Sequence, residues 1–450
     1  MSASQKELQE IFSLTPVQRF MLDCSEHTPS GLAFQQQYSY YLEGKVDPEL
    51  CRKAWEVVIT RHPAMRTSIH HKDTSQAFQV VHAEPTMFFE LRDVSLLDED
   101  ERNGRVLTFL SEDARTPFDI SRPPLMRLCL HKMRDDLFVL TLTLSHLIFD
   151  GWSLGVAFRH FAQAYDELAQ GFAPDVTPLP SMRDYVSWFK KRDQSEDLAW
   201  WREKLATAQM QPLPFMRLPE ESRPVEADQI YHMVFSEEET ASLDAAARKL
   251  GVTLNVLYQG AWALILSRLS PQRRALMLTV AASRPVEVSG IEQVFGLLID
   301  GVPYNVDCAG NQTASTWLEG LRGLQLESLE HRHVPVDTWL RPCQNSDMIP
   351  YNSYLIFENM ATGEGGDTKA DFSIRAAYMN SNLSFPLSMM VFPGPALRVA
   401  FIYCKDFFTH ETIIKFSELI RRTLITLAEN SGETLDRISE LADLNEETIR

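Results

Sequence analysis

The chain has 450 residues, of which 44% are hydrophobic and 23% are charged. This length and composition predict a soluble globular protein with room for two hydrophobic cores, so we expect two lobes. The formal net charge of −18 argues against nucleic acid or an anionic membrane as the main partner, because both bind basic surfaces.

The cysteines and the N-terminus give no signal for a disulfide framework, a metal site or a membrane anchor. Residues 1–12 contain no apolar core of a signal peptide, and no apolar run approaches the roughly 18 to 20 residues of a membrane span. We expect a cytoplasmic protein with reduced thiols and no bound metal. The six cysteines are scattered without a Cys-x-x-Cys pair or a Cys/His cluster: Cys24, Cys51, Cys129, Cys308, Cys343 and Cys404.

The first half of the chain alternates predicted strands and helices up to about Gln170. Residues 138–145 alternate with a period of two, which predicts a strand, and His146 has the parity that points inward at its end. An imidazole in that place can serve as a base; a histidine bonded to a backbone carbonyl is the structural alternative. A helix should follow Asp150 and Gly151, because apolar residues recur there at helical spacing: Leu154, Phe158, Phe161, Tyr165 and Leu168.

Two proline-bearing stretches, 171–181 and 211–228, then interrupt the pattern on either side of one predicted aromatic helix over 185–205. We interpret residues 181–230 as a crossing helix and linker. The N-terminal lobe then spans residues 1–180, and the C-terminal lobe spans residues 231–450.

The C-terminal lobe shows clear signals for helix ends. Ser236 and Glu239 form a capping box ahead of a helix that Gly251 ends, and Thr253 can cap the next helix. A strand over 397–404 and a helix over 411–428 are predicted to close the fold.

The segment Ser145-His146-Leu147-Ile148-Phe149-Asp150-Gly151 is one of a series of short motifs along the chain, and eight others belong to the same series. These are Ser13–Phe20, Arg61–Thr67, Phe118–Arg127, Arg183–Trp188, Trp200-Trp201, Ser283-Arg284-Pro285, His331–Pro335 and Phe357–Asn359. The series resembles the motifs of the condensation domains of nonribosomal peptide synthetases, whose signature is HHxxxDG. This resemblance runs nearly the whole length. It implies an α/β (α+β) fold of two chloramphenicol-acetyltransferase-like lobes in a V, with the active site in a tunnel at their interface.

The resemblance also implies an acyltransferase of secondary metabolite and antibiotic biosynthesis. Such an enzyme transfers an acyl thioester, held on the phosphopantetheine of an acyl or peptidyl carrier protein, to an amine or hydroxyl and forms an amide or ester. The enzyme itself binds no cofactor. The acceptor is carrier-bound or a small molecule. Because the chain starts at Met1 and stops at Arg450, about where an adenylation domain would begin, we interpret it as a free-standing, monomeric enzyme.

By this resemblance His146 is the catalytic histidine. The N–H of Gly151 would approach the thioester oxygen; the alternative is a turn glycine with positive φ. Asp150 invites a triad interpretation in which it orients His146, but the resemblance implies a structural ion pair with Arg284 that links the two lobes. Trp152 is expected to pack rather than to recognise substrate.

The chain departs from the family pattern at two places. Ser145 replaces the first histidine of the signature, and its strand parity points away from His146. Asp300 and Gly301 replace Asn and Thr of another motif, which indicates either an altered substrate channel or a solvated loop. The small polar residues of the bridging segment 380–387, Ser381 and Ser384 among them, are candidates for contacts with pantetheine or acceptor.

Two other functions stay open on the sequence. One is a non-catalytic docking or scaffold relative, which would have no need of His146; the other is an acyltransferase that uses coenzyme A thioesters. Docking of an acidic carrier protein on a chain of charge −18 should depend on local basic groups, for which the candidates are Arg115, Arg122, Lys190, Lys191 and Arg192.

Overall fold

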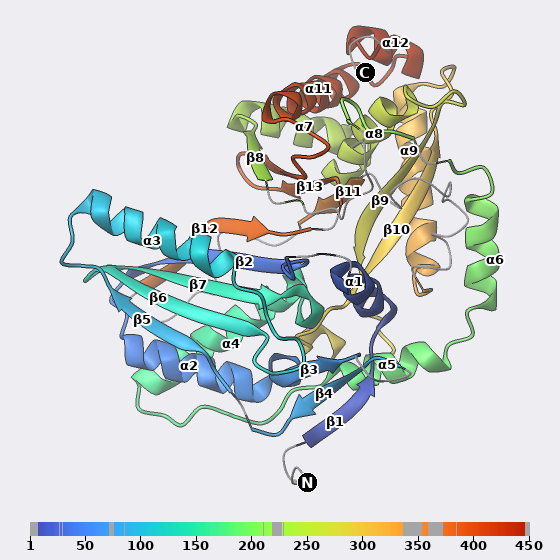
Figure 1. Cartoon of the computed structure of the whole chain (residues 1–450). Coiled ribbons are helices and arrows are strands. Elements are labelled where there is room, and N and C mark those ends of the chain that lie inside the picture. Colours follow the sequence, from blue (N-terminus) through green and yellow to red (C-terminus); the bar gives the residue numbers. More distant parts are fainter. Residues whose placement is uncertain are drawn as a thin grey trace. The chain divides into compact units, whose positions relative to one another are not determined.

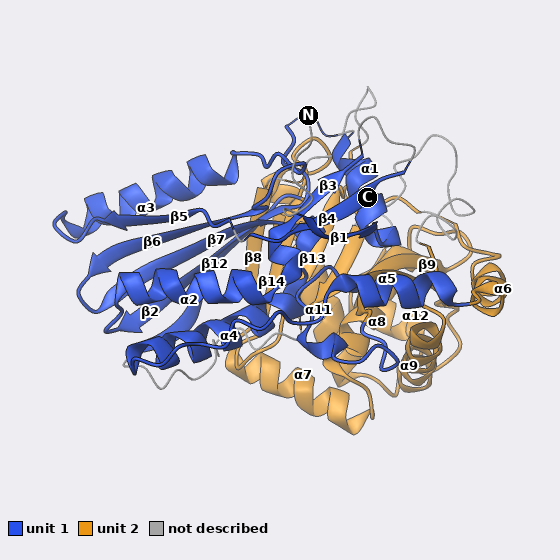
Figure 2. Ribbon diagram, turned by 90° about the horizontal axis from the view of Figure 1, so that it is seen from below, with its two compact units in different colours: residues 1–192, 284–299, 360–382 blue, residues 193–283, 300–359, 383–450 orange. Residues whose placement is uncertain are grey.

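The computed structural model describes residues 8–26, 28, 30–71, 76–84, 86–209, 211–217, 227, 229–335, 353–358, 372–383 and 385–445. The chain divides into two units (Figure 2). Unit 1 contains residues 1–192, 284–299 and 360–382, and unit 2 contains residues 193–283, 300–359 and 383–450. The division is therefore not the contiguous one expected from the sequence, because two segments of the C-terminal half belong to unit 1.

Unit 1 is built on a five-stranded sheet (Figure 1). Strands β12, β2, β7 and β6 pair in antiparallel fashion, and β5 pairs with β6 in parallel. In sheet order the strands are β12 (Phe372–Ser381), β2 (Gln35–Gly44), β7 (Leu137–Ser145), β6 (Met126–Arg134) and β5 (Phe89–Asp93). The long register of β12 against β2 is the reason that residues 372–381 belong to unit 1.

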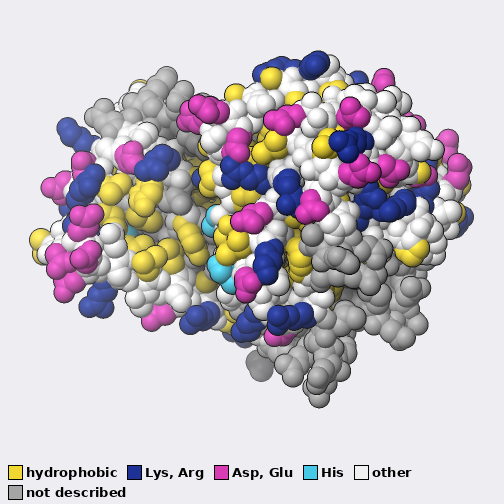
Figure 3. Space-filling view, turned by 90° about the horizontal axis from the view of Figure 1, so that it is seen from above, with side chains coloured by type: hydrophobic (Ala, Val, Ile, Leu, Met, Phe, Trp, Pro, Cys, Tyr) yellow, Lys and Arg dark blue, Asp and Glu magenta, His cyan; other side chains and the backbone are white. Residues whose placement is uncertain are grey.

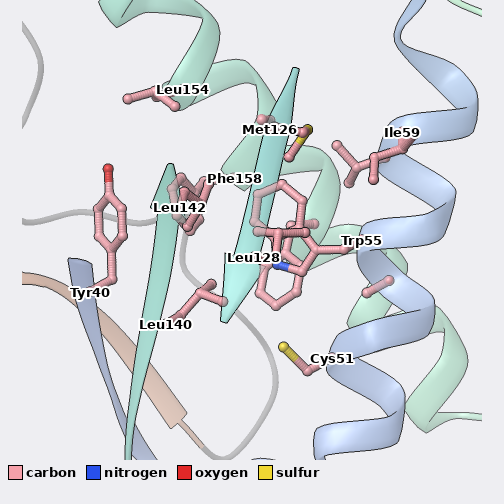
Figure 4. Packing of buried hydrophobic residues seen from close by; sticks show 14 of the residues in the cluster. Tyr40, Cys51, Trp55, Ile59, Met126, Leu128, Leu140, Leu142, Leu154 and Phe158 are labelled. Atoms are coloured by element: carbon pink, nitrogen blue, oxygen red, sulfur yellow. The ribbon is translucent and has the colours of Figure 1, made fainter. Parts of the chain in front are cut away.

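The main core of unit 1 lies between this sheet and helices α2 (Pro48–Arg61) and α4 (Gly151–Ala169). The alternation of β7 places Leu140 and Leu142 on this face, where Figure 4 shows them near Trp55 of α2 and Phe158 of α4. Trp55 packs edge-on against the Phe158 ring with centroids 5.6 Å apart. Burying such aromatic side chains stabilises the fold by roughly 1.5 to 3 kcal/mol each.

Helix α3 (Glu99–Ala114) covers the opposite face of the sheet (Figure 1). Its apolar residues pack with Val139 of β7, but the same face carries a polar group around Asp113. The amide of Gln37 donates to Asp113 Oδ2 at 2.8 Å, Thr143 also donates to that oxygen, and Arg127 pairs with Oδ1 at 2.7 Å.

The remaining parts of unit 1 are a small sheet and helices next to it. The sheet has the order β1 (Leu8–Ser13), β4 (Phe78–His82) and β3 (Thr67–His70), with α1 (Pro16–Glu26) following β1. Helix α5 (Met182–Lys191) packs with Ile291, Val294 and Leu298 from the segment 284–299. This apolar cluster is the reason that the segment groups with unit 1.

Unit 2 contains a six-stranded mixed sheet. Its order is β10 (Ile299–Asp307), β9 (Arg274–Ala282), β11 (Ser353–Phe357), β13 (Leu387–Phe392), β14 (Arg398–Tyr403) and β8 (Gln229–Val234). The first residue of β10, Ile299, is counted with unit 1. β11 runs parallel to β9 and β13, whereas β14 is antiparallel to β13 and β8. The strand predicted over 397–404 corresponds to β14.

Among the described residues, unit 2 contains the helices α6 (Ser195–Lys204), α7 (Glu237–Lys249), α8 (Leu254–Ser267), α9 (Ala314–Glu330), α11 (His410–Glu429) and α12 (Leu435–Leu441). The capping box of Ser236 and Glu239 and the cap by Thr253 are confirmed. The single helix predicted over 185–205 is wrong. It is two helices, α5 and α6, because Asp193 Oδ1 accepts bonds from the backbone N–H and hydroxyl of Ser195 and so starts a new helix.

In the part of the chain that the structure describes, no single helix is both long and apolar enough to cross a membrane; α7 and α8 meet the criterion together only as a pair bent by 96°. Among the described cysteines Cys51, Cys129, Cys308 and Cys404 are buried, and Cys24 is partly buried. Cys343 lies outside the described residues.

Candidate active site

His146 lies directly after β7, at the start of a short 3-10 turn, His146–Ile148. As the alternation over 138–145 predicts, β7 ends at Ser145, and the chain turns before α4 begins. The backbone N–H of His146 donates to the carbonyl of Phe34 at 2.8 Å. Its ring Nδ1 lies 2.7 Å from the carbonyl oxygen of Phe149.

This last contact determines the tautomer of the neutral ring. A carbonyl oxygen can only accept, so Nδ1 must carry the proton and Nε2 keeps its lone pair. Burial lowers the pKa of His146, and the bond to the Phe149 carbonyl and the charge of Asp150 oppose this shift in part. The imidazole is thus neutral near pH 7, with Nε2 able to accept a proton.

Asp150 does not bond the His146 ring, so the triad interpretation fails. It is the N-cap of α4, with a side chain only 1% exposed. Oδ1 accepts from the backbone N–H of Ser153 at 2.9 Å, from its hydroxyl at 2.7 Å and from Arg284 Nη2 at 3.0 Å. Oδ2 accepts from Arg284 Nη1 at 2.9 Å and from the N–H of Leu298 at 3.0 Å.

The ion pair of Asp150 and Arg284 is thus present, bidentate and buried. Its place in the fold differs from the expectation that it links two lobes, because Arg284 belongs to the same unit as Asp150. Ser153 adds to this connection: its hydroxyl oxygen accepts from the N–H of Gly296 at 3.0 Å, and its one proton is shared between Asp150 Oδ1 and the carbonyl of Gly296. The side chains of Asp150 and Ser153 therefore hold the segment 284–299 at Arg284, Gly296 and Leu298.

Gly151 is the first residue of α4 and has helical backbone, so the alternative of a turn glycine with positive φ does not hold. The first N–H groups of a helix have no partner within the helix. Gly151 and His146 are separated only by the turn, which places an N–H donor and an imidazole on consecutive elements.

Trp152 is 51% exposed, more than a packing residue usually is. Its indole N–H donates to the carbonyl of Glu292 at 3.0 Å, and the Arg284 guanidinium lies 5.3 Å from the ring centroid. The segment 284–299 therefore contacts the ring through a backbone carbonyl and through the Arg284 side chain, and about half of the residue's surface is open to solvent.

Ser145 is buried and, by the alternation of β7, lies on the face of the sheet that α3 covers. Its register partner on β2 is Gln35, whose amide donates to the carbonyl of Ala114 at 3.0 Å. The residue that replaces the family's first histidine thus belongs to the polar layer under α3 and not to the side of His146.

Asp300 and Gly301 lie in unit 2, on β10, so the solvated-loop alternative is wrong. Asp300 is 5% exposed, and its Oδ2 lies 3.4 Å from His333 Nδ1. The same nitrogen lies 3.2 Å from the hydroxyl of Ser283. Burial, together with the charge of Asp300, raises the pKa of Tyr354 on β11.

Ser381 is the last residue of β12 and is fully buried, with its hydroxyl accepting a bond from Gln36 Nε2 at 3.2 Å. The chain passes to unit 2 directly after Asn382. Ser384 lies outside the described residues, as does Asn359 of the last motif.

Sequence reasoning missed three contributors to the His146 turn. Phe34 and Phe149 act through backbone carbonyls, which no side-chain pattern reveals. Gln18 donates from its side chain to the carbonyl of Leu147. One signal for Gln18 was available, since Thr15-x-x-Gln18 has the form of a capping box.

The sequence matches the Condensation domain family over residues 8–449. Among curated relatives, one of the linear gramicidin synthase proteins of Brevibacillus parabrevis is 27% identical over 446 residues, which cover 97% of this chain and 6% of that protein. Gramicidin S synthase 2 of Aneurinibacillus migulanus is 26% identical over 440 residues, which cover 96% of this chain and 10% of that protein. The chain thus spans a small fraction of the length of the synthetases that it matches.

Two solved structures share the fold. The first condensation domain of the calcium-dependent antibiotic synthetase, in complex with substrate analogue 3a, has a TM-score of 0.80 at 15% identity, covering 95% of this chain and 98% of that one. The SgcC5 protein from Streptomyces globisporus, in complex with (R)-(-)-1-(2-naphthyl)-1,2-ethanediol and sucrose, has a TM-score of 0.80 at 18% identity, covering 94% and 100%. With a family match over nearly its whole length and this two-lobed α/β fold, the chain belongs to the condensation domain family of nonribosomal peptide synthetases.

Proposed function

We propose that the chain is an acyltransferase that moves an acyl group from a carrier-protein thioester to an amine or hydroxyl. In this reaction the nucleophile attacks the thioester carbonyl, a C–N or C–O bond forms, and the C–S bond breaks. The proton of the nucleophile passes to Nε2 of His146 and from there to the departing thiolate, so the enzyme ends unchanged. The N–H of Gly151 stabilises the negative charge that develops on the carbonyl oxygen.

The observation that carries this proposal is the bond of His146 Nδ1 to the Phe149 carbonyl. It leaves Nε2 as the proton acceptor and holds the ring in one orientation. Asp150, Arg284 and Gly296 act behind the site by fixing the start of α4. Ordering both substrates supplies the larger share of the barrier reduction, roughly 7 to 11 kcal/mol in well-oriented reactions.

His146→Ala tests the proposal. Product formation from a loaded carrier protein, followed by mass spectrometry, should fall by roughly 10² to 10⁴-fold because the base is lost. His232→Ala, at an exposed position of β8, is the matched control and should retain full activity. Unchanged turnover of a folded His146→Ala variant would refute the catalytic assignment of His146. Unchanged output of the pathway in cells that carry His146→Ala would favour the docking or scaffold function instead.

The acyl source is a second point to decide. We propose phosphopantetheine on a carrier protein, and the same acyl group presented on free coenzyme A is the comparison. A much higher kcat/KM for the carrier-bound donor supports the proposal. Equal values would assign the chain to the acyltransferases that use coenzyme A.

The acceptor class follows from the pKa of the nucleophile. An amine reaches the thioester as the free base, whereas an alcohol with a pKa near that of water, about 15 to 16, must lose its proton as the bond forms. SgcC5, with the same fold, was solved with a diol, so alcohols belong in the panel. If both acceptors are used, His146→Ala should depress alcohol acylation at least about tenfold more, roughly 1.4 kcal/mol in barrier. Equal losses would limit His146 to positioning.

We further propose that basic side chains of unit 1 bind the acidic carrier. Arg115, Arg122, Lys190 and Lys191 are exposed, and Arg192 is partly exposed over the ring of Trp188. Figure 3 shows basic and acidic side chains interspersed on one face of the molecule. We therefore expect docking to depend on local groups. Lys190→Glu with Lys191→Glu should raise KM for the carrier-bound donor and leave a small thioester unaffected. A monomeric state and a cytoplasmic location stay predictions.

A further inference from the structure

The N-terminal motif Ser13–Phe20 takes no part in the proposed reaction, yet it reaches the turn that carries His146. Helix α1 lies beside this turn (Figure 1). Gln18 of α1 is 1% exposed, and its Nε2 donates to the carbonyl oxygen of Leu147 at 2.8 Å. Leu147 directly follows His146 and is itself buried.

The orientation of the Gln18 amide is determined by its other bonds. Its Oε1 accepts from the backbone N–H of Thr15 at 2.9 Å, and a backbone N–H can only donate. Gln79 of β4 completes the arrangement: its Nε2 donates to the same Oε1 at 3.0 Å and to the carbonyl of Ser13 at 3.2 Å. Its Oε1 accepts from Gln18 Nε2 at 3.3 Å.

Both hydrogens and both lone pairs of the Gln18 amide are thus engaged. Flipping a buried amide in this state would break several hydrogen bonds at once. The groups that lose their partner are buried and cannot bond water instead, so the flip would cost free energy. The Leu147 carbonyl therefore meets a donor whose place is set by α1 and β4.

The turn is held at successive residues. The N–H of His146 bonds Phe34, the carbonyl of Leu147 bonds Gln18, and the carbonyl of Phe149 accepts the proton of the His146 ring. Rotation of the Leu147 peptide would move the Phe149 carbonyl and with it the ring. Displacements of about 1 Å in a catalytic group can cost about 100-fold in rate.

We propose that Gln18 is a positioning residue that holds the turn so that Nε2 of His146 meets the nucleophile. This inference rests on the proposed function, since it assigns a task to a residue behind the proposed base. It explains why the N-terminal motif accompanies the Ser-His-x-x-x-Asp-Gly segment across more than one hundred intervening residues.

Two variants test it. Gln18→Leu removes the whole amide, and Gln18→Glu keeps the shape and the acceptor for Thr15 but cannot donate to Leu147. Both should lower kcat about tenfold or more, with KM for the acyl donor unchanged, because the base is misplaced while the binding surface is intact. The matched control is Gln211→Leu in unit 2, where a buried amide donates to the Leu276 carbonyl of β9 at 3.0 Å. It should retain kcat.

A second readout does not depend on turnover. The proton on Nδ1 of His146 bonds a carbonyl and should give a slowly exchanging resonance in the ¹⁵N-histidine spectrum of the full chain. We expect Gln18→Leu and Gln18→Glu to shift or broaden it and Gln211→Leu to leave it in place. If wild-type protein shows no turnover, the proposed function fails and this signal still decides the role of Gln18.

Two results would overturn the inference. One is a folded Gln18→Leu or Gln18→Glu variant with wild-type kcat and an unchanged Nδ1 proton signal. The other is failure of both variants to fold while Gln211→Leu folds, which would assign Gln18 to stability of the fold and not to the position of His146.

Discussion

Asp150 in unit 1 and Asp300 in unit 2 are both buried carboxylates, but their surroundings differ. Asp150 is bound by a bidentate arginine, by Ser153 and by a backbone N–H, so each oxygen has more than one donor. Asp300 Oδ2 has no hydrogen-bond partner among the described residues and faces a histidine nitrogen at 3.4 Å.

The comparison shows that burial alone does not tell what a carboxylate does for the fold. A buried charge that loses an arginine partner is left uncompensated, whereas a carboxylate with a poorly satisfied oxygen has less to lose. Asp150 should therefore be needed for stability. Asp300 should tolerate neutralisation.

The largest effect is expected for Asp150→Ala. It leaves Arg284 buried without its carboxylate and should lower the free energy of unfolding by about 3 to 5 kcal/mol in urea titration. Asp98→Ala is the matched control, because Asp98 is also a helix N-cap but is exposed and caps Glu101 of α3 alone. Its loss should be about 1 kcal/mol. Equal losses at the two caps would contradict the importance of the ion pair.

Acid should act on a different pair of unit 1, which joins a buried and a partly buried histidine. His62 Nε2 lies 2.9 Å from His160 Nδ1, and the two rings stack with centroids 5.1 Å apart. Burial and the neighbouring imidazole lower the pKa of His62 to about 3, and burial and Arg61 lower that of His160 to about 4.

In the unfolded chain these two histidines have the ordinary pKa of about 6.5 and bind protons below that pH. In the folded chain they stay neutral until the pH approaches their lowered pKa values. Stability should be complete above that value and fall with acidification by about 1.4 kcal/mol per pH unit for each histidine, until the folded-state pKa is reached. Urea titrations between pH 7 and 4.5 measure this slope, and His62→Phe should flatten it. If the free energy of unfolding depends on pH in the same way in His62→Phe, groups other than this histidine pair cause the acid sensitivity.

A double-mutant cycle separates the ion pair from the other bonds of Asp150. The combined Asp150→Ala and Arg284→Ala variant should lose less stability than the sum of the single variants, by roughly 0.5 to 3 kcal/mol, because no charge is left alone. Strict additivity would mean that the two side chains are not coupled.

Ser153→Ala should have a smaller effect, roughly 1 to 3 kcal/mol, since it removes a hydroxyl that bonds Asp150 Oδ1 and the backbone of Gly296 but leaves the ion pair. The same urea titration measures it. A loss as large as that of Asp150→Ala would show that the hydroxyl, and not the arginine, holds the segment 284–299.

The smallest effect is expected at Asp300. Asp300→Asn removes a buried charge and should change the free energy of unfolding by less than about 1 kcal/mol, in either direction. Asp150→Asn, the same chemical change in unit 1, should cost several times more. If the two variants lose the same free energy of unfolding, the different hydrogen bonds of the two carboxylates do not affect stability.

Local patterns predicted much of this structure. The caps at Ser236 and Thr253 and the alternation of β7 depend on contacts within a few residues, and the structure contains all of them. The helix over 185–205 was predicted too long because its aromatic residues continue past Asp193, whose side chain bonds the backbone and restarts the helix.

The sequence by itself determined the family, the α/β fold and the residue types around the turn, because each motif is a short run of neighbours. The tertiary structure alone decided which groups meet: that Nδ1 of His146 bonds a backbone carbonyl and not Asp150, that Gln18 reaches Leu147, and that residues 284–299 and 372–381 belong to unit 1. The first of these contacts depends on the exact geometry of the turn, which residue types do not determine. The others join segments that are distant in sequence, through a hydrogen bond, apolar packing or sheet pairing, and no pattern within one segment reveals the partner.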